Sequence, residues 1–250
     1  MNKKNMVVVP VSGVMPEWLE KRKGIMGEID RQLIQELRQS GTGLTLDQLQ
    51  LLTEHSDPFV VNIEKILQQW GQFYKDIFSI EPDLSSINIP IVQSGFAWLS
   101  ICLQEIPLAN LWQAYGDQGL DRWSCYNDLA VAVTHNDRNC KNGSYSVWMR
   151  NCWEADEELK NTSAIQLQEQ SISGCTLYER LNIGLFQWWV SGGKKGGRHL
   201  DEKFITLCSG SRDDDGFVPG VGRSDGKVGV CWCLPDRAGD GLRARQVVSS

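Results

Sequence analysis

Hydrophobic positions recur with a helical period through the first eighty residues of the chain. A serine–glycine stop, a capping-box pattern and an aspartate–proline pair divide this stretch into three helices. They are expected over residues 15–40, 45–55 and 57–78. The pattern predicts a helical region at 15–80, preceded by a tail or strand at 1–14. The apolar stripes are typical of a core, and a partner-binding helical module is the alternative.

A different organisation begins after this helical region. Residues 81–91 are polar and contain two prolines, which predicts a linker, so a second domain is expected over 92–250. Alternating or continuous apolar runs predict strands at 95–103, 145–150, 204–208 and 242–248. Helical spacing predicts helices at 108–115, 154–167 and 176–190, the second of them opened by acidic residues that complement the helix dipole. The fold class is therefore α+β, a small antiparallel sheet with two helices and long loops.

Residues 228–233 show a strict period of two. Apolar and small side chains alternate there, so one face of a strand should be buried and the other more open. The expected buried residues are Val228, Val230 and Trp232, and the expected exposed residues are Gly229, Cys231 and Cys233.

Charge and cysteine usage restrict the function. The net charge of −6 argues against a general binder of nucleic acid or anionic membranes, which needs a basic surface. No apolar run approaches the roughly 18 residues that span a bilayer, and no signal peptide is evident, so a cytoplasmic protein without membrane insertion is expected. The eight cysteines include no C-x-x-C pair and are expected to be mostly reduced thiols.

The stretch 209–245 has an unusual composition. Lys, Glu, Gln, Met and Trp make up 58 of the 250 residues, so eight or nine would be expected among these 37 positions, yet only Lys227 and Trp232 occur. A glycine-rich region of loops and edge strands would explain part of this depletion.

The sequence TLCSGSRDDDGFVPGVGRSDGKVGVCWCLPDRAGDGLRARQVVS resembles the variable region of diversity-generating retroelement variable proteins, and YSVWMRNCWEADEELKN and TLYERL resemble upstream segments of such proteins. The resemblance covers about residues 90–249. It implies a C-type lectin fold of the formylglycine-generating-enzyme subtype. It also implies that error-prone copying at adenines changes certain codons, so that they come to encode many different amino acids. Lys, Glu, Gln, Met and Trp are not among these amino acids. Arg223 stands where the resemblance implies an aromatic residue.

The resemblance separates scaffold positions from ligand-facing ones. The implied scaffold includes Val218, Pro219, Val221, Gly226, Lys227, Val228, Val230, Trp232, Pro235, Ala238, Leu242, Arg243, Ala244 and Arg245. The implied variable, ligand-facing positions are Asp213, Asp214, Phe217, Gly220, Gly222, Gly229, Cys231, Cys233, Leu234, Asp236, Arg237, Gly239, Asp240 and Gly241. From their spacing alone, Arg243 and Arg245 should project to one face of a strand and act structurally, through the planar donor fork of arginine.

Several residues could belong to a metal or catalytic site, but structural roles suit them better. Cys231 and Cys233 could form a zinc site with Cys208 and His199, but the spacing fits no standard zinc knuckle. Leu234-Pro235-Asp236 offers a single carboxylate, whereas calcium prefers six to eight oxygens. An acidic group at 154–158 is more typical of a helix start than of acid–base catalysis.

The sequence thus predicts a ligand-binding display protein, with no catalytic residue, metal or cofactor. Its expected partner is a protein or surface ligand of unknown identity. Two alternatives stay open, an enzyme on a formylglycine-generating-enzyme-like fold and a plain protein-interaction domain. A convergent set of titratable groups in a pocket would favour the enzyme.

Overall fold

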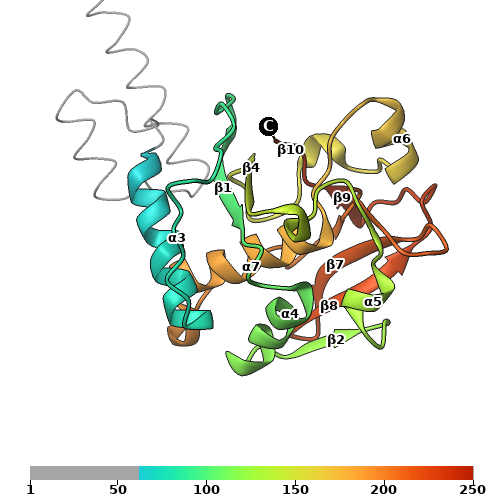
Figure 1. The fold of residues 1–250 in the computed structure, drawn as a ribbon. Coiled ribbons are helices and arrows are strands. Elements are labelled where there is room, and N and C mark those ends of the chain that lie inside the picture. The colour runs from blue at the N-terminus through green and yellow to red at the C-terminus, as the bar shows by residue number, and fades with distance from the viewer. Residues whose placement is uncertain (1–61, 250) are drawn as a thin grey trace, which may run out of the picture. The chain divides into compact units, whose positions relative to one another are not determined.

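The computed structural model describes residues 62–249 as a mixed α and β structure (Figure 1). The predicted tail at 1–14 and the predicted helices over 15–40 and 45–55 lie outside these residues. None of the helices within 62–249 is long and apolar enough to cross a membrane.

The described helices are α3 (Ile63–Phe78), α4 (Leu108–Asp117), α5 (Leu129–Ala132), α6 (Ala164–Glu169) and α7 (Leu177–Val190), with 3-10 turns at Cys140–Asn142, Glu157–Leu159 and Gly193–Lys195.

The strands form three small sheets. The first has the order β1 (Phe96–Cys102), β4 (Tyr145–Arg150), β10 (Val247–Val248) and is antiparallel. The second is mixed, with the order β2 (Arg122–Ser124), β8 (Lys227–Cys233), β7 (Val218–Ser224), β5 (Ile205–Leu207), β9 (Leu242–Ala244). The third pairs β3 (His135–Asn136) with β6 (Ser211–Arg212).

Helix α7 crosses the middle of the described region and contacts both larger sheets (Figure 1). Its first twelve residues, Leu177 to Trp188, are all buried, as expected for a helix that is covered on every side. The sequence predicted this helix correctly. Thr176 caps it, and Glu179 completes a capping box.

The third predicted helix is present as α3, but it begins at Ile63 with Asn62 as its N-cap, later than the aspartate–proline pair suggested. Trp70 of α3 stacks on Phe186 of α7 with ring centroids 3.9 Å apart, and its indole donates to the Leu99 carbonyl at 2.9 Å. Helix α3 therefore belongs to the same core as the sheets, because a single cluster of buried side chains contains all of these elements.

The predicted linker at 81–91 is a packed connection. Leu84 and Ile87 are buried, Ser146 donates to the Asn88 carbonyl, and the Trp148 indole donates to the Pro90 carbonyl at 2.7 Å. Polar composition and prolines indicated irregular backbone correctly. They did not indicate that this backbone lies against β4.

Two further expectations are wrong. Residues 154–167 do not form one helix. The 3-10 turn Glu157–Leu159 is followed by the short α6, which starts after Ser163 with its own capping box to Gln166. The expected strand at 242–248 is two strands in different sheets, since β9 pairs with β5 and β10 with β4.

Candidate functional site

The outer face of β7 and β8 carries five of the predicted variable positions. Gly220 lies opposite Cys231, and Gly222 lies opposite Gly229. Cys233 lies opposite Val218 on the same face, because directly opposed residues of an antiparallel pair project to one side. All five positions line one cavity of about 140 Å³.

Side chains from neighbouring strands form the walls of this cavity. Trp123 of β2 is 43% exposed and Ile205 of β5 is 41% exposed, and both line the cavity with Arg223 and Ser224. A Cβ at Gly229 would lie 2.6 Å from Trp123 Nε1, so the indole covers this glycine. Gly229 is consequently buried, and its expected exposure is wrong. Gly220 is buried as well.

A disulfide joins Cys231 to Cys125, with a Cα–Cα distance of 5.0 Å. The expectation of reduced thiols is correct for six of the eight cysteines and wrong for this pair. Cys125 directly follows β2, which runs parallel to β8 and brings the two cysteines together although 106 positions separate them in sequence. The predicted site residues did not include Cys125, Trp123 or Ile205. The one sequence signal for this part of the site is Trp123, a tryptophan in a polar loop.

The opposite face of the same strands packs into the core. Val221, Val228 and Val230 are buried, as predicted for the last two. Trp232 shares their face but is 50% exposed, and its ring centroid lies 5.0 Å from that of Phe217. Its expected burial is therefore wrong. The alternation identifies the face correctly, but the core ends at Val230, and Trp232 extends past it beside the turn at 213–217.

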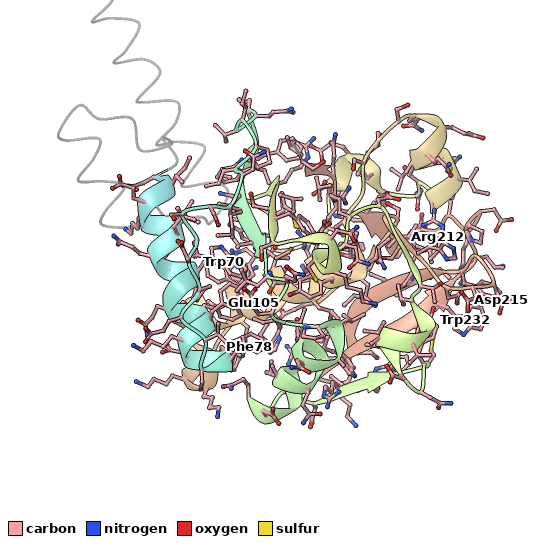
Figure 2. The ribbon with its side chains drawn as sticks, viewed as in Figure 1. Trp70, Phe78, Glu105, Arg212, Asp215 and Trp232 are labelled. Atoms are coloured by element: carbon pink, nitrogen blue, oxygen red, sulfur yellow. A yellow bond between two sulfur atoms is a disulfide. The ribbon has the colours of Figure 1, made fainter. Side chains whose placement is uncertain are left out.

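The Asp213 carboxylate has hydrogen-bond partners within its own turn and on Tyr126. Its carboxylate accepts hydrogen bonds from the backbone N–H groups of Asp215 and Phe217 and from the Tyr126 hydroxyl. Asp214 accepts one from Thr134 at 2.7 Å. The turn is thus fixed by its own aspartates, as is common for this residue type. Figure 2 shows Asp215, Trp232 and Arg212 at the same end of the molecule, away from Trp70 and Phe78.

The remaining predicted variable positions follow β8 directly. They lie in the segment between β8 and β9 and are exposed or half-buried: Leu234, Asp236, Arg237, Gly239, Asp240 and Gly241. Leu234 is 47% exposed, which is unusual for leucine and extends the open surface beyond the cavity.

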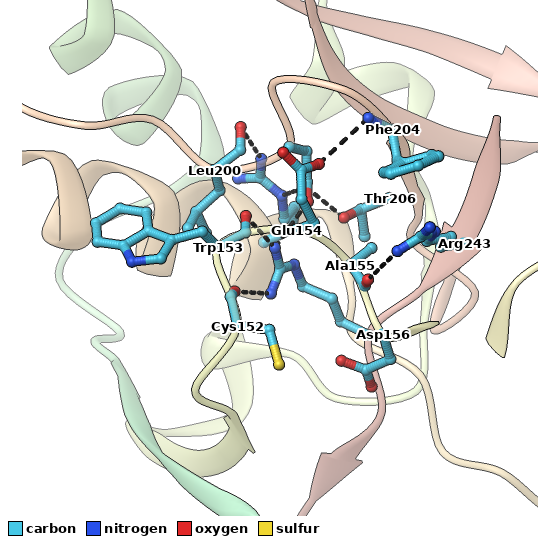
Figure 3. Close-up of polar contacts among 12 residues, drawn as sticks. Cys152, Trp153, Glu154, Ala155, Asp156, Leu200, Phe204, Thr206 and Arg243 are labelled. Atoms are coloured by element: carbon cyan, nitrogen blue, oxygen red, sulfur yellow. Dashed lines mark hydrogen bonds and ion pairs between the residues drawn. The ribbon is translucent and has the colours of Figure 1, made fainter. Parts of the chain in front are cut away.

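The two arginines of the last segment are buried, with protein acceptors, as the sequence predicted. Arg245 donates to the carbonyls of Cys152 and Trp153 and to Asp201, at 2.8, 2.9 and 2.7 Å (Figure 3). Arg243 pairs with Glu157 at 2.5 Å and donates to the Ala155 carbonyl. Asp201 also pairs with Arg180 and accepts from Thr206.

Asp201 is the centre of this buried network. Burial opposes its ionisation, but the guanidinium groups of Arg245 and Arg180 outweigh that effect, and the pKa of Asp201 is lowered. The acidic group at 154–158 supplies Glu157 as the partner of Arg243. Asp201 was not among the predicted residues, because nothing in its local sequence distinguishes it.

The residues considered for metal binding or catalysis do not converge. Cys231 is in the disulfide, Cys208 is fully buried, and within residues 62–249 no three His, Cys, Asp or Glu side chains are grouped to hold a metal ion. The acidic residues at 154–158 have local partners. Glu154 accepts from the N–H groups of Lys203 and Phe204, and Asp156 accepts from that of Gln246.

Comparison with known proteins gives no relative from which a function can be transferred, because no family model, curated protein or solved structure matches the chain.

Proposed function

We propose that this protein is a ligand-binding display protein of the diversity-generating retroelement class, with a C-type-lectin-like domain whose binding surface is built from residues 213–241. The proposal rests on the sequence resemblance, and one structural observation supports it. The five small predicted variable residues of β7 and β8 line one cavity at the surface, while the valines that alternate with them are buried in the core.

This division suits a surface that changes while the fold persists. Buried valines determine stability, because each truncation in a packed core is costly. Exposed positions away from such features usually tolerate substitution within about 0.5 kcal/mol. Positions on this face such as Cys233 can therefore vary while the core persists, whereas the disulfide at Cys231 and the indole over Gly229 restrict change at those two positions.

The size of the cavity favours a macromolecular partner. Pockets for small molecules usually measure about 300–1,000 Å³. The cavity at Gly222 and Gly229 measures only about 140 Å³ and is mainly lined by apolar atoms. An engineered apolar cavity of about 150 Å³ holds a benzene molecule. The site thus has room for one apolar side chain of a partner, the kind of anchor that dominates protein interfaces.

Two matched libraries test this proposal. The first randomises Cys233, Leu234, Asp236, Arg237, Gly239 and Asp240. The second randomises Val218, Val221, Val228, Val230, Leu242 and Ala244. Each is displayed on yeast, scored for protease-resistant folding and selected against a fixed panel of purified proteins. The first library should keep the fold in most members and yield binders, and the second should lose the fold.

Equal loss of folding in both libraries would contradict the proposal, as would a first library that folds but yields no binder. The retroelement assignment has an independent test. DNA flanking the gene should contain a near-identical repeat of the segment that encodes the variable region, differing at adenines. If the complete flanking DNA has no such repeat, the assignment is wrong even if the surface binds proteins.

A further inference from the structure

A second and larger cavity lies away from the surface just described. It measures about 670 Å³, within the range of small-molecule sites. One wall is formed by residues 134–137 and 209–212, where β3 pairs with β6, and the other by residues 164–174, from α6 to the segment before α7. None of the fourteen predicted variable positions lines it.

Arg212 brings a positive charge to this groove. Its Nη1 donates to the carbonyls of Ser209 and Ser211 at 2.7 and 2.8 Å, which fixes the plane of the guanidinium group. Its Nε and Nη2 have no acceptor among residues 62–249, and no carboxylate there lies within ion-pair distance. Arg212 is half-buried, and burial lowers its pKa, although the group stays cationic.

The arginines nearest the core differ from Arg212 because each of them pairs with a carboxylate. The pairs are Arg138 with Glu179, Arg180 and Arg245 with Asp201, and Arg243 with Glu157. Burying a charge without a partner is costly. A half-buried guanidinium in the lining of a cavity, with its Nε and Nη2 free, is therefore suited to an anion that enters from outside.

Asp137 brings the opposite charge to the same groove. Its backbone N–H donates to the Gly210 carbonyl, but its carboxylate accepts no hydrogen bond from the described residues. It lies near enough to Arg212 to oppose the lowering of that residue's pKa, yet it does not form an ion pair with it. The remaining polar side chains of the lining are the His135 imidazole and the hydroxyl and amide groups of Thr134, Asn136, Gln168, Ser171, Ser173 and Ser209.

We propose that this groove binds a small zwitterion of amino-acid chemistry. Its carboxylate accepts two parallel hydrogen bonds from Nε and Nη2 of Arg212, the bidentate geometry that arginine forms with carboxylates. Its ammonium group lies at the Asp137 carboxylate. Leu167 and Ile172 offer apolar contact to the remainder of the ligand. A free amino acid and a short peptide with free ends share this chemistry.

Calorimetric titration of the full chain tests the proposal, with leucine, serine and glutamine as probes. Each probe is compared with its N-acetyl form, which lacks the ammonium group, and with its amide, which lacks the carboxylate. Trileucine tests whether the two charges are preferred on one residue or at the ends of a peptide. We expect binding by a free amino acid or by trileucine, and at least tenfold weaker binding by the blocked forms.

Variants of the two charged residues should reproduce the effect of the blocked probes. Arg212→Gln should weaken binding of the free probe at least tenfold and leave the amide unchanged. Asp137→Asn should also weaken binding of the free probe at least tenfold, and it should leave binding of the N-acetyl form unchanged. Arg212→Lys keeps the charge but loses the bidentate edge. Its affinity for the free probe should therefore lie between those of the wild type and Arg212→Gln. Arg198→Gln, an exposed arginine outside the groove, is the matched control and should bind as the wild type does.

Thermal melts establish that each variant is folded before titration. The proposal is overturned if neither the amino acids nor trileucine binds at millimolar concentration. It is also overturned if the blocked probes bind as well as the free ones. The blocked probes are tested on the unaltered chain, so this second result does not depend on any variant folding.

Discussion

Replacement of Arg245 by methionine should strongly destabilise the fold. Arg245 is 1% exposed and donates three hydrogen bonds, one to Asp201 and two to the backbone of residues 152 and 153. Methionine fills much of the same volume but donates none. Removal of one partner from a buried ion pair usually costs about 3–5 kcal/mol. Asp201 keeps Arg180 and Thr206 in the variant, so we expect a loss within that range, about 3–4 kcal/mol.

Urea unfolding at 25 °C, followed by tryptophan fluorescence and far-ultraviolet circular dichroism, measures this loss. Arg245→Lys should lose about 1–3 kcal/mol, because lysine keeps the charge but cannot reach all three acceptors. The matched control is Arg223→Met, since Arg223 pairs with Glu202 at 3.2 Å at the surface of the same sheet, with side chains 27% and 49% exposed. A surface pair contributes about 0–1 kcal/mol.

Acid unfolding adds a second, independent measurement. The pKa of Asp201 is lower in the folded protein than in the unfolded chain, where it is about 3.9. Its contribution to stability is therefore complete above the unfolded value and is lost as the pH falls towards the folded value. Without Arg245 the folded pKa rises, so acid unfolding should begin at a higher pH. Equal losses for Arg245→Met and Arg223→Met, with unchanged acid unfolding, would refute the structural role of Arg245.

Three further predictions concern other parts of the molecule. Reduction of the Cys125–Cys231 disulfide, or Cys231→Ser, should lower the free energy of unfolding by about 2–4 kcal/mol in urea titrations, because the bond closes a loop that spans 106 positions. Burial, with Arg223 nearby, lowers the pKa of His199 to about 4. Between about pH 6.5 and 4 the unfolded chain thus binds a proton at this histidine that the folded protein does not bind. The free energy of unfolding therefore decreases as the pH is lowered through this range. His199→Gln should remove about 1–2 kcal/mol of the loss measured between pH 7.5 and pH 5, allowing for solvent screening of this half-buried group. Trp232→Ala should cost about 1 kcal/mol or less and Trp148→Ala about 3–5 kcal/mol in the same melts, because the first side chain is half-exposed and the second fully buried.

Local patterns predicted the helices and strands whose signals lie within a few residues. Helix α7 begins at Thr176 with a capping box, and β4 has the predicted limits Tyr145–Arg150. The failures come from interactions over long distances in sequence. The segment after β4 was predicted as helix because its acidic residues suit a first turn. In the fold its carbonyl groups bind Arg245 and Arg243 instead. The capping box at Ser163 was visible in the sequence and identifies the true helix start.

The candidate site was predictable only in part. Alternation identified the two faces of β8, and the valines confirm the buried one. It could not indicate how far the core extends, so Trp232 was misplaced. The pairing of Cys125 with Cys231 depends on β2 lying parallel to β8, and connectivity of this kind cannot be deduced from cysteine spacing. The charged groove at Arg212 and Asp137 is formed by segments far apart in sequence, so no local pattern marks it.

The division of residues 242–248 between two sheets has a consequence during synthesis on the ribosome. By the time Leu242 is added, β4, β5 and α7 have already been synthesised, and the strand edges that β9 and β10 will cover are still unpaired. Asp201 also lacks the guanidinium of Arg245 until then. The nascent chain thus cannot close either sheet, or complete its buried charge network, before this segment appears. Chains interrupted upstream of residue 242 should expose both edges and be prone to aggregation and proteolysis.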